Sequence, residues 1–229
     1  METYTPDDQL TNLKTWWKQY GTALIAGVAI GGLLLGGGNY WKQDKTKRAE
    51  AASLLYESLL ADLQQGKPDT LTATAMDGGS AENAGAAFLP TATKLMQDYE
   101  ATPYAGKAAL LLARARFDAK DMAGTRQHLE WAMQNATEVS VQHSARLRLG
   151  RLLLDQGDAE AALALVKIKE TDGFVSEYEE LKGDALLAKG DRQAARRAYQ
   201  AALAALARGS SYAQALGMKR DNLGAEPAP

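Results

Sequence analysis

Apolar residues follow two patterns along this chain, one continuous run and then a long series of helical stripes. The uncharged run extends from Gln19 to Trp41, between Lys18 and Lys42. A bilayer core of about 30 Å needs roughly 20 apolar helical residues, so the run predicts one transmembrane helix at residues 21–41. Beyond it, apolar residues return every three or four positions, which is typical of amphipathic helices. The sequence therefore predicts an all-α protein with one membrane span and one larger helical domain.

Aromatic residues stand at both ends of the predicted span. Amphipathic rings are enriched at the depth where lipid headgroups meet hydrocarbon, so they favour a membrane helix over a buried core helix. We expect four of them to anchor the span at its interfaces: Trp16, Trp17, Tyr40 and Trp41. A cleaved signal peptide is the alternative, but the stretch before the run holds three acidic residues against two lysines and lacks a basic start.

Glycines within the predicted span have the spacing of a helix-packing motif. In lipid, helices associate through close van der Waals fit, which small residues four positions apart allow. Two such pairs predict a packing face made of Gly27, Gly31, Gly32 and Gly36. The pattern leaves open whether the partner is a second copy of the chain or a different membrane protein.

The charges beside the span bear on its orientation. The twenty residues before it hold two lysines, whereas the twenty after it hold four basic residues. Because Lys and Arg concentrate on the cytoplasmic side, this bias would place the large domain in the cytoplasm. The rule is weakest where a long domain follows the span, so both orientations stay open at this point.

Breaks in the periodicity divide the chain into segments. An apolar stripe from Ala49 to Leu63 predicts that helix continues after the span, while Gly66 and Pro68 end it. The predicted segments are an N-terminal tail and amphipathic lead-in at 1–20, the span at 21–41, a helical extension at 42–65, a flexible loop at 66–85, a repeat domain at 86–223 and a disordered tail at 224–229.

A repeat of 33 residues organises the helical domain. A glycine, a Gly-Asp pair and an alanine recur at this offset, as Gly150, Gly157, Asp158 and Ala162 and then as Gly183, Gly190, Asp191 and Ala195. The period is that of a tetratricopeptide repeat, a helix pair that buries its apolar face against its neighbours. A weaker copy lies 37 residues earlier, around Asp121. We predict an α-solenoid of about three imperfect pairs, with capping helices at about 86–99 and 210–222.

Composition excludes several classes of function. The 26 basic and 28 acidic residues nearly balance, so no basic footprint for nucleic acid stands out. There is no cysteine, and the two histidines, His128 and His143, lack a serine nucleophile or metal ligands at suitable spacing. We interpret the carboxylates at the predicted turns as helix caps rather than acid/base pairs: Asp118, Asp121, Asp155, Asp158, Asp184 and Asp191. We therefore expect no enzyme and no catalytic, cofactor or metal site.

Binding of other proteins is the remaining class of function. In a tetratricopeptide repeat the first helix of each pair lines the concave face, where apolar and charged residues would alternate and accept a helix or extended segment. The phase of the repeat predicts a partner-binding groove made of Leu110, Arg114, Phe117, Leu147, Arg151, Leu154, Glu180, Asp184 and Leu187. The alternative is that Leu110, Leu147 and their neighbours belong to the core.

The order of these features resembles a known family. The acidic start METYTPDDQ, the lead-in LKTWWKQYGTAL, a glycine-rich span ending in NYW, and the helices LRLGRLLLDQGDAEAAL and LKGDALLAKGDRQAARRAYQAAL are similar to the YfgM family of bacterial inner-membrane proteins. The resemblance covers almost the whole chain. It implies a cytoplasmic N-terminus, a periplasmic tetratricopeptide-like domain, association with the SecYEG translocon, and partnership with the membrane-anchored periplasmic chaperone PpiD.

On this resemblance we predict a single-pass inner-membrane protein that serves as an ancillary subunit of the Sec translocon and couples exported proteins to periplasmic chaperones. Two other functions stay open. A periplasmic holdase would bind unfolded exported clients directly through an exposed apolar groove. A cytoplasm-facing, membrane-anchored scaffold or regulator is what the charge bias favours.

Overall fold

The structure, a computed structural model, describes six ranges of the chain: residue 14 and residues 16–22, 44–64, 88–167, 173–207 and 209–224. Contacts divide the chain into two units, Met1–Glu50 and Ala51–Pro229. Every regular element within the described ranges is a helix, and none of these ranges contains a strand. The predicted all-α class is therefore confirmed.

In the first unit, a short helical segment at residues 16–22 exposes its aromatic rings. Trp16 and Trp17 are 46% and 53% exposed, and the Trp16 ring lies 6.0 Å from that of Tyr20, centroid to centroid. None of the helices in the described ranges has the length and apolar character that crossing a bilayer requires. Residues 23–41 of the predicted span, which include Gly27, Gly31, Gly32, Gly36, Tyr40 and Trp41, lie outside the described residues.

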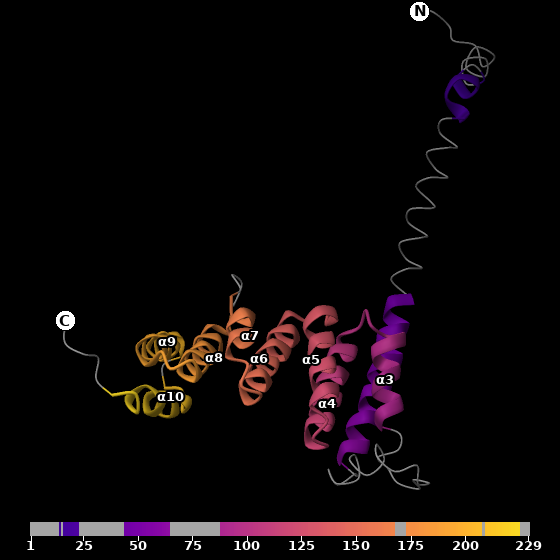
Figure 1. Ribbon diagram of the computed structural model, residues 1–229. Helices are drawn as coiled ribbons and strands as arrows, with labels where there is room; N and C mark the ends of the chain where they lie inside the picture. The colour runs from indigo at the N-terminus through magenta and orange to yellow at the C-terminus, as the bar shows by residue number, and fades with distance from the viewer. Residues whose placement is uncertain are drawn as a thin grey trace, which may run out of the picture. The chain divides into compact units, whose positions relative to one another are not determined.

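In the second unit, helices follow one another and each packs against the next in chain order (Figure 1). After the helix that ends at residue 64 come α3 (Phe88–Asp98), α4 (Pro103–Asp118), α5 (Met122–Asn135), α6 (Val139–Asp155), α7 (Ala159–Leu165), α8 (Val175–Ala188), α9 (Arg192–Ala205) and α10 (Tyr212–Asp221). Helices α4 and α5, α6 and α7, and α8 and α9 form the three pairs. The predicted tetratricopeptide-like solenoid is confirmed.

The same short turn joins the two helices of each pair. A residue with positive φ comes first: Lys120 (62°), Gly157 (82°) and Gly190 (86°). The next residue is an aspartate whose carboxylate accepts a hydrogen bond from a backbone N–H three positions on, at 2.8, 3.0 and 2.9 Å for Asp121, Asp158 and Asp191. Such a cap satisfies a backbone donor that the helix start leaves unpaired. The capping interpretation is confirmed for these three aspartates. It is wrong for Asp184, which lies inside α8, and for Asp118 and Asp155, which are the last residues of α4 and α6.

Two glycines at equivalent repeat positions permit close packing against α8 and α9. A Cβ on Gly183 would lie 2.5 Å from the Tyr199 ring, whereas one on Gly150 would meet the end of the Leu181 side chain. A side-chain end can turn aside more easily than a packed ring. The glycines thus let α8 pack closely against α6 and against α9, and the tighter constraint is at Gly183.

Further helices pack at both ends of the three pairs. Ala52 and Leu59 are fully buried in a cluster with Phe88 and Leu95 of α3. At the other end, Leu216 of α10 is fully buried against α9. A helix pair exposes an apolar face where its neighbour is missing, so these end helices shield the solenoid core from solvent.

Candidate partner-binding groove

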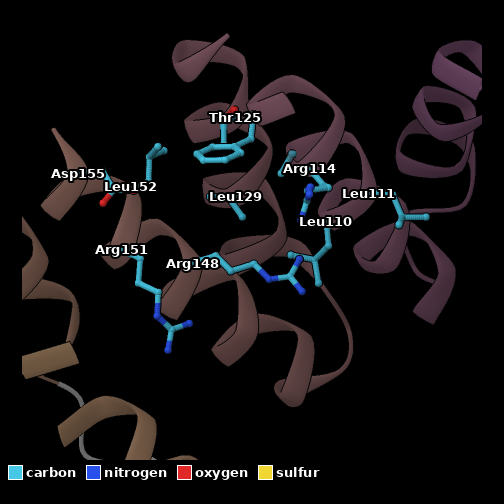
Figure 2. Close-up of a pocket in the computed structure, with 11 residues that line it drawn as sticks. Leu110, Leu111, Arg114, Thr125, Leu129, Arg148, Arg151, Leu152 and Asp155 are labelled. Atoms are coloured by element: carbon cyan, nitrogen blue, oxygen red, sulfur yellow. The ribbon is translucent and has the colours of Figure 1, made fainter. Parts of the chain in front are cut away.

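A pocket of about 450 Å³ opens between α4, α5 and α6 (Figure 2). We call it the binding pocket. Its walls are formed by residues of all three helices: Leu110, Leu111, Ala113, Arg114, Phe117, Thr125, Leu129, Arg148, Arg151, Leu152 and Asp155. Its size lies within the range of roughly 300 to 1,000 Å³ in which proteins bind ligand groups.

The floor of the binding pocket is apolar. Leu129 of α5 and Leu152 of α6 are 3% and 4% exposed, and Leu110 of α4 is half-buried beside them. Phe117, the second-to-last residue of α4, is 38% exposed. A large exposed aromatic ring next to a buried apolar floor is typical of a protein-binding surface.

Three arginines surround this floor, and they differ in their partners. The Arg114 Nε lies 2.8 Å from a carboxylate oxygen of Asp118, one turn along α4. Arg151 lies 3.9 Å from Glu180 of α8. The exposed Arg148 forms no ion pair with any residue that the structure describes. In Figure 2 its side chain extends across the pocket toward Leu110 and Arg114.

The predicted groove residues of the first pair all line the binding pocket. Leu110, Arg114 and Phe117 lie there together on α4. Their spacing of three and four positions places them on one helix face, which is why the sequence found them.

The prediction for the second pair is only partly matched by the structure. Arg151 lines the pocket, but Leu147 is 4% exposed and packs against Tyr178 and Leu181 in the core, and Leu154 is half-buried against core residues. Sequence reasoning missed Arg148 and Asp155. Their signal was present, since residues 148, 151, 152 and 155 have the spacing of one helix face.

In the third pair, the predicted residues Glu180 and Asp184 are covered by α10. Lys219 Nζ donates hydrogen bonds to Glu180 and Asp184, both at 2.8 Å, and the Tyr212 hydroxyl donates to Glu180 at 2.6 Å. The Tyr199 hydroxyl of α9 donates to Asp184 at 2.7 Å. We call these five residues the α10 cluster. The third predicted residue, Leu187, is 36% exposed.

The α10 cluster raises the pKa of three of its groups. Burial and the hydrogen bond to Asp184 raise the pKa of Tyr199, and the hydrogen bond to Glu180 raises that of Tyr212. Burial opposes the charge on Lys219, but hydrogen bonds to Asp184 and Glu180 outweigh it and raise the pKa of the amine. Each group therefore holds its proton more tightly in the folded chain.

The two histidines differ in their burial and in the residues beside them. The Nδ1 of the buried His143 lies 2.9 Å from the Tyr178 hydroxyl. Burial lowers the pKa of the half-buried His128, and Arg116 adds to that effect. Across the described ranges, no group of three or more His, Asp or Glu side chains gathers as metal ligands would.

Comparisons with known proteins agree with this architecture. The family model of a tetratricopeptide repeat-like domain matches residues 14–225. Proteins named ancillary SecYEG translocon subunit are similar over most of their length. The Neisseria gonorrhoeae protein is 30% identical over 94% of this chain and 95% of its own, and the Escherichia coli K12 protein is 29% identical over 88% and 89%. No solved structure gives a significant match.

Proposed function

Because the chain belongs to the family of ancillary SecYEG translocon subunits and to the tetratricopeptide repeat-like domain family, we propose that it is a non-catalytic protein-interaction subunit of a Sec translocon. The observation that carries the proposal is the binding pocket, which is open and has an apolar floor. At the two ends of the solenoid, by contrast, further helices cover the apolar residues. In such repeats, stacked helix pairs present a continuous surface to another protein segment.

We propose further that residues 21–41 anchor the chain in the bacterial inner membrane, with the repeat domain in the periplasm. The uncharged run between two aromatic belts supports the anchor. The name of the relatives, ancillary SecYEG translocon subunit, supports a place beside a translocon, and the resemblance to the YfgM family supports the periplasmic orientation. From there the domain would hand exported chains to a periplasmic chaperone, and the resemblance to the YfgM family supports PpiD as that chaperone.

The first test is copurification with SecYEG from detergent-solubilised membranes. We expect the full chain to recover the channel, and Phe117→Ser to reduce recovery because it removes the exposed ring from the binding pocket. Val139→Ser is the matched control, since Val139 is 62% exposed on α6 and does not line the pocket. Failure of the wild-type chain to recover an intact channel would refute the association.

The proposed membrane contact has a separate test. Replacing Gly27 and Gly31 by leucine should lower recovery of the channel by blocking close helix approach, while the unfolding midpoint of the repeat domain stays the same. Undiminished recovery would exclude this glycine pair from the contact.

The compartment can be tested because the chain has no cysteine. With Ala225→Cys, a membrane-impermeant thiol reagent should label cells whose outer membrane alone has been permeabilised. Protection until the inner membrane is broken would place the domain in the cytoplasm, as a scaffold or regulator there. Copurification of PpiD with the labelled chain would then test the proposed chaperone partner.

A holdase is the second candidate, because the apolar floor of the binding pocket could also hold unfolded clients. A holdase suppresses aggregation of a denatured client protein without other factors. The holdase function would be favoured over that of an ancillary subunit if the isolated full chain suppresses client aggregation and the Phe117→Ser variant does not.

A further inference from the structure

Arg148 lines the binding pocket and has no ion pair with the residues that the structure describes, so it defines the chemistry of a partner. We propose that the pocket receives an acidic segment of another protein, with a carboxylate on Arg148 and a neighbouring apolar side chain on the floor formed by Leu129 and Leu152. The inference rests on the proposed function and adds to it the chemical class of the segment.

Charge is the first argument. Three arginines and one aspartate line the pocket, and Asp118 already holds Arg114 while Arg151 lies near Glu180. Arg148 is the lining arginine without an ion pair among the described residues. A guanidinium beside apolar walls is less screened than one in open water, and its planar fork binds carboxylates in two parallel hydrogen bonds.

Shape is the second argument, and it favours a protein segment over a lipid surface. The apolar floor is recessed between three helices, and Leu129 and Leu152 at its base are almost fully buried. A side chain that projects from a peptide can enter such a recess, whereas a bilayer surface contacts protruding residues. The volume of about 450 Å³ accommodates a few side chains and no more.

The acidic groups at the edge of the pocket limit the number of charges on the segment. Asp155 lies on the same helix face as Arg148, and Asp118 stands beside Arg114. Further carboxylates placed against either would be repelled. The surface therefore fits one or two acidic residues next to an apolar anchor rather than a long acidic run.

The test measures peptide binding to the full chain in detergent by fluorescence anisotropy. The probe is a labelled peptide of about twelve residues, built from Ala, Leu and two Glu, together with two versions in which Gln or Lys replaces Glu. We expect the Glu peptide to bind about tenfold more tightly than the Gln peptide, which corresponds to the free energy of a charge-assisted contact. The Lys peptide should bind most weakly.

Charge reversal at the proposed contact provides the decisive comparison. Arg148→Glu should abolish the preference for the Glu peptide and improve binding of the Lys peptide. Arg197→Glu is the matched control, because Arg197 is exposed on α9 outside the pocket, and it should leave the order unchanged. Arg148 is itself exposed, so unfolding curves of both variants should match that of the wild type.

Three results would overturn the inference. The first is equal binding of the Glu and Gln peptides, and the second is a Glu preference that survives Arg148→Glu. The third is Arg148-dependent binding to phosphatidylglycerol vesicles without binding of the Glu peptide, which would assign the pocket to lipid headgroups. Recovery of SecYEG without Glu selectivity would refute this inference alone, whereas Glu selectivity without recovery of SecYEG would refute the proposed function alone.

Discussion

Equivalent surfaces of the solenoid are used differently at its two ends. At α4 and α6 the charged residues around the binding pocket are exposed, and Arg148 has no ion-pair partner among the described residues. At α8, Asp184 is the equivalent of Arg151, but it lies under α10 together with Glu180, and Lys219 holds both carboxylates. The same repeat position thus serves an open surface in one pair and an internal contact in another. Charge at a groove position does not by itself indicate a partner site.

The largest effect should come from reversing the charge that holds α10. Lys219→Glu puts a third carboxylate beside Glu180, whose side chain is 4% exposed, and Asp184. We expect a loss of about 3 kcal/mol in the free energy of unfolding, at the low end for a broken buried pair because Lys219 is partly exposed. Urea unfolding followed by circular dichroism measures it.

Lys94→Glu is the matched control for this change, since Lys94 is exposed on α3 and has no ion pair in the described part of the chain. It should change the free energy of unfolding by less than about 0.5 kcal/mol. Equal losses in the two variants would mean that the α10 cluster is no more important to stability than an ordinary surface charge.

A smaller effect is expected from adding a methyl group at the equivalent glycines. Gly183→Ala forces Cβ against the Tyr199 ring and should cost about 2 kcal/mol. Gly150→Ala meets the movable end of Leu181 and should cost less. In α10, a Cβ on Gly217 has nothing within 4 Å, so Gly217→Ala should be neutral or stabilising. Thermal unfolding of the three variants gives the order, and a larger loss for Gly150→Ala would reverse our assignment of the tighter contact.

The next smaller effect should come from alkaline pH, which should reduce the stability that the α10 cluster provides. Tyr199, Tyr212 and Lys219 have pKa values raised above the ordinary 10.0 and 10.5, so the folded chain retains protons that the unfolded chain releases. Their stabilisation is complete below pH 10 and falls as the pH rises above it. We expect a loss of about 1 kcal/mol over the first pH unit, reduced by solvent screening at the exposed groups.

Urea unfolding at a series of pH values measures this loss, with Tyr199→Phe as the comparison. The variant lacks one of the three titrating groups, so its stability should fall less steeply with pH. Parallel curves for the two proteins would show that Tyr199 does not contribute to the pH dependence.

The smallest effect on folding should come from the binding pocket itself. Arg151 is 48% exposed and 3.9 Å from Glu180, so Arg151→Ala should change the free energy of unfolding by less than about 1 kcal/mol. Its effect should appear in partner recovery instead. If Arg151→Ala lowered the free energy of unfolding as much as Lys219→Glu, the binding pocket could not be called an open surface in contrast to the internal contact under α10.

The sequence predicts the solenoid well because each pair is specified locally. Asp121, Asp158 and Asp191 cap the helix that follows them, and these contacts join residues only three positions apart. The position of α10 could not be predicted in this way. Lys219 reaches Glu180 across 39 residues and lies outside the 33-residue repeat.

The binding pocket was predicted in part for a related reason. The repeat phase identified the α4 face and Arg151, but it carried the second set of residues onto Leu147 and Leu154 rather than Arg148 and Asp155. The prediction already applied the offset of 37 between these pairs, but Leu147 packs against Tyr178 and Leu181 of α8, a contact between pairs that the repeat phase does not specify. The glycine face of the span stays a prediction.

The dependence of Glu180 on Lys219 has a consequence for how the chain is made. Helices α3 to α9 contact mainly their neighbours in sequence, so they can fold in the order in which a ribosome or a channel delivers them. The Asp184 carboxylate, however, receives its cation only with α10, and without α10 Glu180 keeps only the more distant Arg151. A copy that stops before Tyr212 would carry uncompensated acid and a bare apolar end, and proteases could recognise it as unfinished.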